Sequence, residues 1–516
     1  MRKILTLCLC TAVCLQTWSQ TKFYCLENDA VHRFLTEVDY SDDVNYTYTK
    51  ITDYCDPVPY NYTYRKDQPN PVPLQWNKNV SLKNQRIEVS EDSLFSNYLT
   101  YTVDKEANAY DIYNLIPGRR YYYRVMGTKS DNSVTMLDSA CFNTTGTLRM
   151  LKIDGIFNVR DMGGWTGLGG HKIRYGVLFR GSRMTSNGSA QAMITNAGKQ
   201  AMLDAGIKAD LDLRTAQERN LSASPLGSTV SYYYINDAYT SRIATFANSD
   251  ASIRGIKYII ARLKEDKPVY FHCSVGADRT GSIAFLIGAL CGMSEDQLAK
   301  EFELTSFSAD YVITNGKAED LRRRRTYAGR YDSSEEDYKY ALMIERAKAL
   351  TGQILQRKIY NHLKNGIGSG ETIPEEDLDW LIEYLVDYKI VKEVITDRNQ
   401  KRKGLSMDPG NQTQLILSYL PADATAQGFE YESMDENVAT VDANGLVTAV
   451  AGGTTYVLAT IDGLSASYKV TVSGPAASAP QIPAQAGQEP IYNMAGQELY
   501  APAGIFILNG RKYINK

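Results

Sequence analysis

The residues most suited to chemistry lie in segment 272–282, HCSVGADRTGS, where a cysteine and an arginine stand six positions apart. Gly276 lies between them and lets the chain turn tightly. Residues 267–271 form a short β-favouring run, and residues 281–290 are apolar nearly all round, which predicts a buried helix. A turn that leads from a strand into a helix N-terminus gathers unpaired backbone N–H groups that bind phosphate. The segment therefore predicts a phosphate site with a cysteine nucleophile.

The residue types in this loop suit attack on phosphorus. The loop N–H groups and the helix N-terminus lower the pKa of Cys273, so that its sulfur is a thiolate near neutral pH. Arg279 has the planar guanidinium that binds two phosphate oxygens. Thr280 is placed to donate to the thiolate when a phosphocysteine breaks down, and His272 is expected to orient the loop. The other predicted phosphate-binding residues are Ser274, Val275, Gly276, Ala277 and Asp278, of which Asp278 must point outward or hold the loop.

Four ordered sequence blocks resemble the protein tyrosine phosphatase superfamily. Residues 272–281 match its signature His-Cys-x-x-Gly-x-x-Arg-Thr-Gly at every fixed position. The blocks FNVRDMGG (157–164), FRGSR (179–183) and DLRT (212–215) precede it in the order of the atypical bacterial branch, which also contains tyrosine-phosphatase-like phytases and lipid phosphatases. The resemblance covers about residues 153–398. It implies an α/β catalytic domain with a central sheet and helices, a phosphocysteine intermediate, and no metal or other cofactor.

Charged residues of these blocks are expected to support the loop. Arg160, Asp161, Arg180 and Asp212 are predicted to be structural and to pair with each other beneath it, and Arg214 belongs to the same supporting set.

A general acid is also needed to protonate the leaving oxygen. The resemblance places it on an aspartate a few tens of residues before the nucleophile, which favours Asp237 at the end of the aromatic run 232–235. Asp212 and Asp278 are the alternatives.

The substrate class stays open between several phosphomonoesters. Lipid-directed relatives carry a lysine where this chain has Ala277, which argues against phosphoinositides. Arg183, Lys208 and the arginine run 322–325 are candidates for holding further phosphates, although the run also fits a solvated helix face. Phosphotyrosine is favoured over phosphoserine, phosphothreonine and inositol phosphates. A hypothesis of another class is a non-catalytic surface protein that binds phosphorylated ligands.

The N-terminus predicts export. Met1-Arg2-Lys3 precedes an apolar run over 4–15 and a small-residue cleavage site, which indicates a signal peptide over 1–19 that is too short to span a bilayer. We therefore expect a secreted, periplasmic or cell-surface protein. Five cysteines remain after cleavage: Cys25 is free to pair with Cys55 or Cys141, Cys273 is needed as a thiolate, and Cys291 is expected to be inert.

The rest of the chain divides into further domains. Its 516 residues allow three or four of them, and a net charge of −3 argues against a nucleic-acid partner. A Leu-x-Pro-Gly-x-x-Tyr pattern ending at Tyr121 resembles the tyrosine corner of fibronectin type III domains. Alternating strands around Asn444-Gly445 resemble bacterial immunoglobulin-like domains, which suggests attachment to a cell surface.

The expected boundaries follow from these patterns. They are a signal peptide (1–19), a segment with extra strands (20–65), a fibronectin-like sandwich (66–147), the catalytic domain (148–403), an immunoglobulin-like domain (404–473), and a linker with a β-rich tail (474–516) that is either a sorting element or a hairpin cap. Helices are predicted before the motif strand, after a capping box at Ser294 and Gln297, and over 335–363 and 375–394.

Overall fold

The computed structural model describes residues 22–40, 54, 67–77, 80–235, 247, 249–308, 311–314, 317–320, 340–366, 370–426, 428–475, 504–508 and 511–515. The chain divides into two compact units. The first comprises residues 1–395, 418–428 and 461–465, and the second comprises residues 396–417, 429–460 and 466–516.

The first unit opens with a β-sandwich and one helix. Its elements are β1 (Lys22–Cys25), α1 (Asp29–Glu37), β2 (Val72–Gln75), β3 (Asn84–Ser90), β4 (Leu99–Val103), β5 (Ala109–Ile112), β6 (Arg120–Thr128) and β7 (Val134–Thr145). The larger sheet has the order β1-β7-β6-β3-β4, and β2 pairs with β5. Val72 and Ile112 share one core with Ile87 and Val125, so the two sheets pack together. The hydrogen bond expected of a tyrosine corner is present, because the Ile116 N–H donates to Tyr121 Oη at 2.9 Å.

The pairing of Cys25 with Cys141 is wrong. Both are free thiols, and the parallel register of β1 with β7 places Cys25 beside Thr145, four positions beyond Cys141. Four strand residues span about 13 Å, whereas a disulfide needs Cα atoms within about 7 Å. Cys55 lies outside the described residues.

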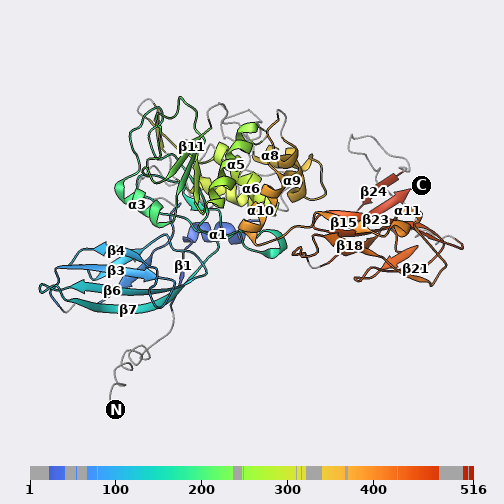
Figure 1. The fold of residues 1–516 in the computed structure, drawn as a ribbon, viewed down its shortest axis with the longest axis horizontal. Coiled ribbons are helices and arrows are strands. Elements are labelled where there is room, and N and C mark those ends of the chain that lie inside the picture. Colours follow the sequence, from blue (N-terminus) through green and yellow to red (C-terminus); the bar gives the residue numbers. More distant parts are fainter. Residues whose placement is uncertain are drawn as a thin grey trace, which may run out of the picture. The chain divides into compact units, whose positions relative to one another are not determined.

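A five-stranded mixed sheet forms the centre of the catalytic region (Figure 1). Its strands are β8 (Arg160–Asp161), β9 (Leu178–Gly181), β10 (Ala209–Asp212), β11 (Ser231–Tyr234) and β12 (Val269–His272), in the order β11-β10-β12-β9-β8. All neighbours are parallel except β8 with β9. His272 is in register with both Asp212 and Gly181, so the carboxyl ends of three strands meet at one edge.

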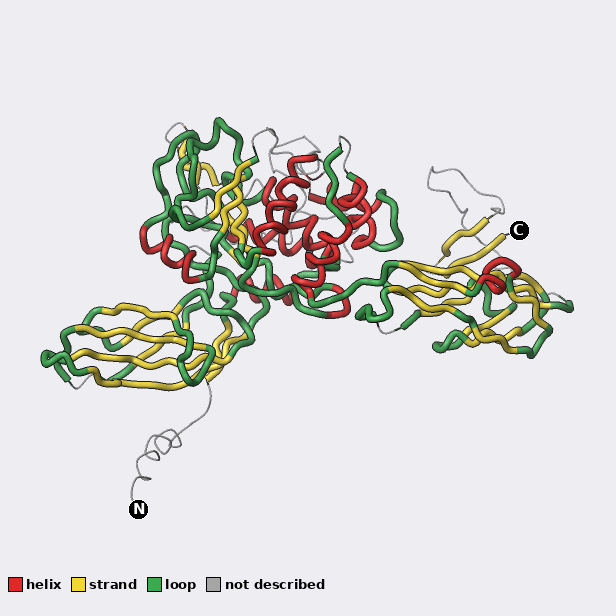
Figure 2. The backbone as a smooth tube through the Cα atoms, viewed as in Figure 1, coloured by secondary structure: helices red, strands yellow, loops and turns green. Residues whose placement is uncertain are grey.

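Helices cover both faces of this sheet (Figure 2). The helices of this region are α3 (Asn196–Asp204), α5 (Asp250–Lys264), α6 (Asp278–Leu290), α7 (Glu295–Glu303), α8 (Tyr340–Lys348), α9 (Leu355–Asn365) and α10 (Glu375–Val386). The region also contains the 3-10 turns η1 (Leu168–Gly170) and η2 (Leu304–Phe307) and the short strands β13 (Tyr311–Thr314) and β14 (Lys317–Asp320). Val269 and Phe271 point into one core with α5 and α6, whereas Tyr270 between them joins a second core with Met202 of α3. This alternation follows from the two-residue period of a strand.

Two predicted helical features are confirmed. All 13 residues of α6 are buried, as its apolar sequence indicates. Ser294 and Gln297 form the predicted capping box at the start of α7.

The two long helices predicted over 335–363 and 375–394 are shorter in the structure. The pattern over 335–363 forms α8 and α9 with a break between them, and residues 335–339 lie outside the described residues. The helix expected over 375–394 ends at Val386, because Asp387 adopts a left-handed conformation with a φ of 52°.

The second unit consists almost entirely of strands. Between residues 393 and 472 the chain forms β15 (Glu393–Thr396), α11 (Arg398–Lys403), β16 (Leu405–Met407), β17 (Gln412–Gln414), β18 (Leu417–Leu420), β19 (Glu430–Ser433), β20 (Ala439–Val441), β21 (Leu446–Ala449), β22 (Gly453–Ile461) and β23 (Leu464–Val472). Two sheets have the orders β16-β23-β22-β19 and β17-β21-β20. The predicted Asn-Gly hairpin joins β20 to β21: Gly445 has a φ of 80°, and the Asp442 carboxylate accepts from the N–H groups of Asn444 and Leu446.

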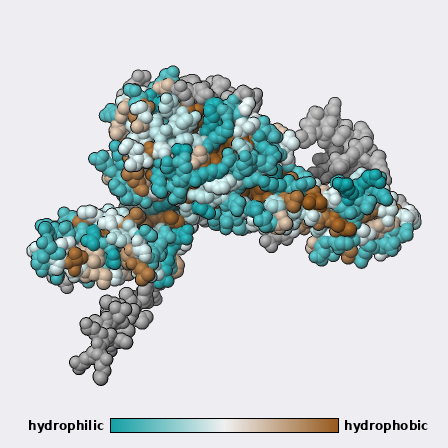
Figure 3. All heavy atoms as spheres, in the orientation of Figure 1, coloured by the Kyte–Doolittle hydropathy of each residue, from teal (hydrophilic) through white to brown (hydrophobic). Residues whose placement is uncertain are grey.

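The tail contains a hairpin, in which β24 (Gly504–Leu508) pairs antiparallel with β25 (Arg511–Asn515). Hydrophilic residues predominate on the visible surface of the catalytic region (Figure 3), while most of its buried apolar side chains lie in the two cores. Among the helices that the structure describes, none combines the length and the apolar character needed to cross a membrane.

Candidate active site

The predicted nucleophile lies where β12 passes into α6. Cys273 directly follows the strand, and the helix begins at Asp278. Gly276 has a φ of 75°, and an added Cβ would lie 2.4 Å from the carbonyl oxygen of Gly181 at the end of β9. The close approach of β9 therefore restricts position 276 to glycine.

The carbonyl groups of the loop point into the protein. Asn158 Nδ2 donates to the carbonyl oxygens of Val275 and Gly276 at 3.0 and 3.3 Å, and Arg180 Nη2 donates to Gly276 O at 2.6 Å. Arg183 Nη1 donates to Ser274 O at 2.8 Å. In a trans peptide the N–H group points away from the C=O group, so this arrangement turns the loop N–H groups toward the phosphate position.

The buried arginines beneath the loop pair with Glu301 of α7. Arg160 Nε lies 2.8 Å from Glu301 Oε1, and Arg180 Nη1 lies 2.5 Å from Glu301 Oε2. All three residues are buried. Two arginines and one carboxylate, with the donors that Arg180 and Asn158 supply, thus anchor the underside of the loop. The prediction that Arg160 and Arg180 pair with Asp161 and Asp212 is wrong, because their carboxylate partner is Glu301, 141 and 121 positions away in the chain.

Asp161 does not pair with either of these arginines. It lies 3.3 Å from Arg149 Nη1 and accepts from the N–H groups of Gly163 and Gly176. Burial raises its pKa above the ordinary range, against the effect of Arg149. Its side chain holds the entry segment in place, and the prediction that it pairs beneath the loop is wrong.

Asp212 is also structural, and its partner is Arg214. Arg214 Nη2 donates to Asp212 Oδ2 at 2.7 Å, and the Asp212 carboxylate lies 4.0 Å from His272 Nδ1. His272 Nε2 lies 3.2 Å from Asp210 Oδ1, and all four residues are buried. Burial opposes the charged His272, but the two carboxylates outweigh it and raise its pKa. This environment favours the protonated ring of His272, next to the predicted nucleophile.

Glu218 is a site residue that sequence reasoning missed. Its carboxylate accepts from Arg279 Nη1 and Nη2 at 2.7 and 2.9 Å, and from Ser274 Oγ at 2.7 Å. Burial opposes the charge, but Arg279 lowers the pKa of Glu218 to about 2. The bidentate pair fixes the plane of the guanidinium. The signal was a carboxylate four residues after Arg214, just beyond the DLRT block.

The environment of Cys273 favours the thiolate. The residue is 2% exposed. Burial and the nearby Asp278 charge both raise its pKa, but Arg279 and the Thr280 donors outweigh them and hold the pKa below its ordinary value. Cys291 shows the contrast, because burial alone raises its pKa to about 12 and disfavours the thiolate.

The structure also describes two of the remaining predicted residues, Asp278 and Lys208. Asp278 is buried, so it does not point outward. Lys208 precedes β10, at the end of the strands opposite Cys273, and its Nζ donates to Asp266 O at 3.2 Å, so it does not line the site. Asp237 and the arginine run 322–325 lie outside the described residues.

Removing the carboxylate beneath the loop tests its structural role. We expect Glu301→Ala to lower the free energy of unfolding by about 3–5 kcal/mol, because two buried guanidinium groups lose the carboxylate that balances their charge. Urea unfolding of the full chain measures this change. Glu295→Ala on the same helix is the matched control: the Glu295 pair with Lys348 is exposed, so the loss should be about 1 kcal/mol or less. Equal losses in the two variants would contradict the account.

Two family models match the chain. Residues 151–357 match the tyrosine phosphatase family, and residues 391–472 match the bacterial Ig-like domain of group 2. The first match contains Cys273, Arg279, Glu218 and Glu301.

Curated relatives match over the catalytic region. A Cupriavidus necator protein that carries the name of a tyrosine-protein phosphatase is 25% identical over 174 residues, which cover 30% of this chain and 61% of that protein. A tyrosine-protein phosphatase of Nostoc commune is 29% identical over 148 residues, which cover 25% of this chain and 49% of that protein. The chain thus spans about half the length of these relatives.

A solved structure also matches, but with little similarity. Domains 4 and 5 of the S-layer protein SbsC share 15% identity and a TM-score of 0.14, and the match covers 16% of this chain and 53% of that one. The family models and the curated relatives agree that residues 151–357 are similar to the tyrosine phosphatase family, and the segment 391–472 is similar to bacterial Ig-like domains.

Proposed function

We propose that the protein is a secreted phosphatase that hydrolyses phosphomonoesters, phosphotyrosine foremost, through a phosphocysteine intermediate. The observation that carries this proposal is the buried sulfur of Cys273, whose pKa is lowered beside Arg279 at the start of α6. The two curated relatives are named as tyrosine-protein phosphatases, which supports phosphotyrosine as the first substrate to test.

The chemistry proceeds in two displacements. The Cys273 thiolate attacks phosphorus, the bond from phosphorus to the leaving oxygen breaks, and a general acid gives that oxygen a proton. Water then attacks the phosphocysteine, the carboxylate that gave up its proton in the first step takes one from this water, and the sulfur leaves as a thiolate next to Thr280. Arg279 binds the phosphoryl oxygens in both steps, held in plane by Glu218.

The general acid is one of two aspartates. Asp212 no longer qualifies, because Arg214 and His272 hold it as a buried carboxylate and lower its pKa. Asp237 remains the first candidate, since it follows β11, the neighbour of β10 in the sheet. Asp278 is the second candidate, because its charge acts directly on Cys273.

Export and attachment rest on the ends of the chain. The apolar run 4–15 behind a basic start supports a signal peptide over 1–19. The Ig-like domain supports attachment of the phosphatase to a cell surface. Inositol phosphates are the alternative substrates, because Arg183 lies against the loop and adds positive charge near it.

Replacement of the nucleophile tests the reaction. We expect Cys273→Ser to lose about 10⁴-fold or more in kcat/KM on an aryl phosphate, because a serine hydroxyl is not ionised there. The assay follows phosphate release from phosphotyrosine peptides, phosphoserine peptides and inositol hexakisphosphate. Cys141→Ser, in the sandwich, is the control and keeps wild-type rates. Normal turnover by Cys273→Ser would overturn the mechanism, and inositol hexakisphosphate as the best substrate would favour the alternative.

Substrates with different leaving groups distinguish the two candidates for the general acid, Asp237 and Asp278. We expect Asp237→Asn to lose about 10²-fold or more in kcat on an alkyl phosphate and little on an aryl phosphate with an acidic phenol, which leaves without a proton. Asp278→Asn is the paired variant. A selective loss in Asp278→Asn alone would assign the acid to the loop instead, and equal losses on both substrates would indicate a structural role.

A further inference from the structure

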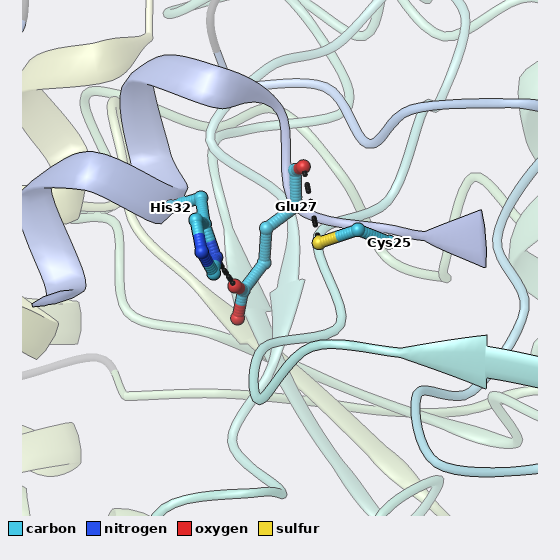
Figure 4. Close-up of side chains that lie close together, drawn as sticks. All are labelled: Cys25, Glu27 and His32. Carbon is cyan, nitrogen blue, oxygen red and sulfur yellow. Dashed lines mark hydrogen bonds and ion pairs between the residues drawn. The ribbon is translucent and has the colours of Figure 1, made fainter. Parts of the chain in front are cut away.

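A second group of reactive side chains lies far from Cys273 in the sequence, at the end of β1 and the start of α1. Cys25, Glu27 and His32 place one ligand atom each within 4.8 Å of one another (Figure 4). His32 Nδ1 lies 2.9 Å from Glu27 Oε2, and Cys25 Sγ lies 3.7 Å from the backbone oxygen of Glu27. The three side chains come from a segment of eight residues, so few backbone movements change their spacing.

The central carboxylate is held in place before any ligand binds. Glu27 is 3% exposed, and its Oε1 accepts from the N–H groups of Thr147 and Leu148 at 2.6 and 2.8 Å. Gly146 has a φ of 113°, and an added Cβ there would lie 3.3 Å from Glu27 Cδ. The backbone of 146–148 thus wraps around the carboxylate and leaves only Oε2 directed at His32.

We propose that Cys25, Glu27 and His32 bind a divalent zinc-like cation. A thiolate, an imidazole nitrogen and a carboxylate oxygen are the ligand set that Zn²⁺ prefers, whereas Mg²⁺ and Ca²⁺ prefer oxygen alone. Zinc bonds of about 2.0–2.3 Å place tetrahedral ligand atoms about 3.3–3.7 Å apart, which the cluster reaches by small side-chain rotations. Cys25 and His32 are exposed, which leaves an entry path and a side for water as the fourth ligand.

Binding exchanges protons for the cation. The metal takes the place of the proton between His32 Nδ1 and Glu27 Oε2, and the Cys25 thiol loses its proton to become a thiolate ligand. No electron is transferred. Because Glu27 is bonded to the N–H groups of Thr147 and Leu148, the cation braces β1 and α1 against the segment that leads into the catalytic region. The site is structural and is independent of the proposed phosphatase reaction.

The test uses the full mature chain, reduced and freed of metal with a chelator. We expect calorimetry to show one Zn²⁺ per chain with proton release, and Co²⁺ to give a thiolate charge-transfer absorption in the near ultraviolet. Zinc should raise Tm by a few degrees, as a ligand of the folded state does. Cys25→Ser and His32→Ala should each weaken zinc binding at least tenfold. Cys141→Ser and Cys273→Ser are the matched controls and should keep the cobalt absorption.

Three results would overturn the proposal. One is the lack of zinc binding below about 100 μM, and another is zinc binding that Cys25→Ser leaves unchanged. The third is a disulfide at Cys25, found by peptide mapping of unreduced protein. If Cys25→Ser does not fold, His32→Ala decides, and unchanged zinc binding in that variant would overturn the proposed site.

Discussion

The site depends on the direction of the carbonyl groups in one short loop. For the N–H groups of residues 274–278 to surround a phosphate, their carbonyl groups must turn into the protein, where each needs a donor. Asn158, Arg180 and Arg183 supply those donors. A buried guanidinium group in turn needs a carboxylate to balance its charge, and Glu301 forms ion pairs with both Arg180 and Arg160. The need to bind the carbonyl groups of this loop thus accounts for a network of buried polar residues that extends to α7.

A second set of charges prepares the reacting groups on the open side of the loop. Glu218 binds Arg279 through both terminal nitrogens, and Arg279 in turn favours the Cys273 thiolate. Beneath them, Asp210 and Asp212 hold His272, which precedes the nucleophile. The carboxylates therefore do not contribute chemistry of their own here. They hold two cationic groups, Arg279 and His272, in position beside Cys273.

The sequence predicts what is local and misses what is distant. The strand before Cys273, the buried α6, the Ser294 capping box and the Asn-Gly hairpin all follow from neighbouring residues, and each is present. The partner of Arg160 and Arg180 could not be predicted, because Glu301 belongs to a helix pattern that looks like an ordinary solvated face. The helix predicted over 375–394 is too long for a related reason. Asp387 ends the helix by adopting a left-handed conformation, and the pattern of apolar residues is not interrupted at that position. The spacing of hydrophobic residues along the chain predicts helices and strands, but buried ion pairs form only when those helices and strands pack together.

The ionisation of Cys273 is the central claim, and its reaction rate with iodoacetate across pH measures it directly. Peptide mapping follows carboxymethylation of Cys273 alone in the native full chain. Because Arg279 and Thr280 lower the pKa of this thiol, the rate should reach its plateau at a lower pH than that of an ordinary cysteine, whose pKa is about 8.5, and fall as the thiolate is protonated. A rate whose midpoint lies at or above the ordinary thiol pKa of about 8.5, as burial alone would give, would contradict the account.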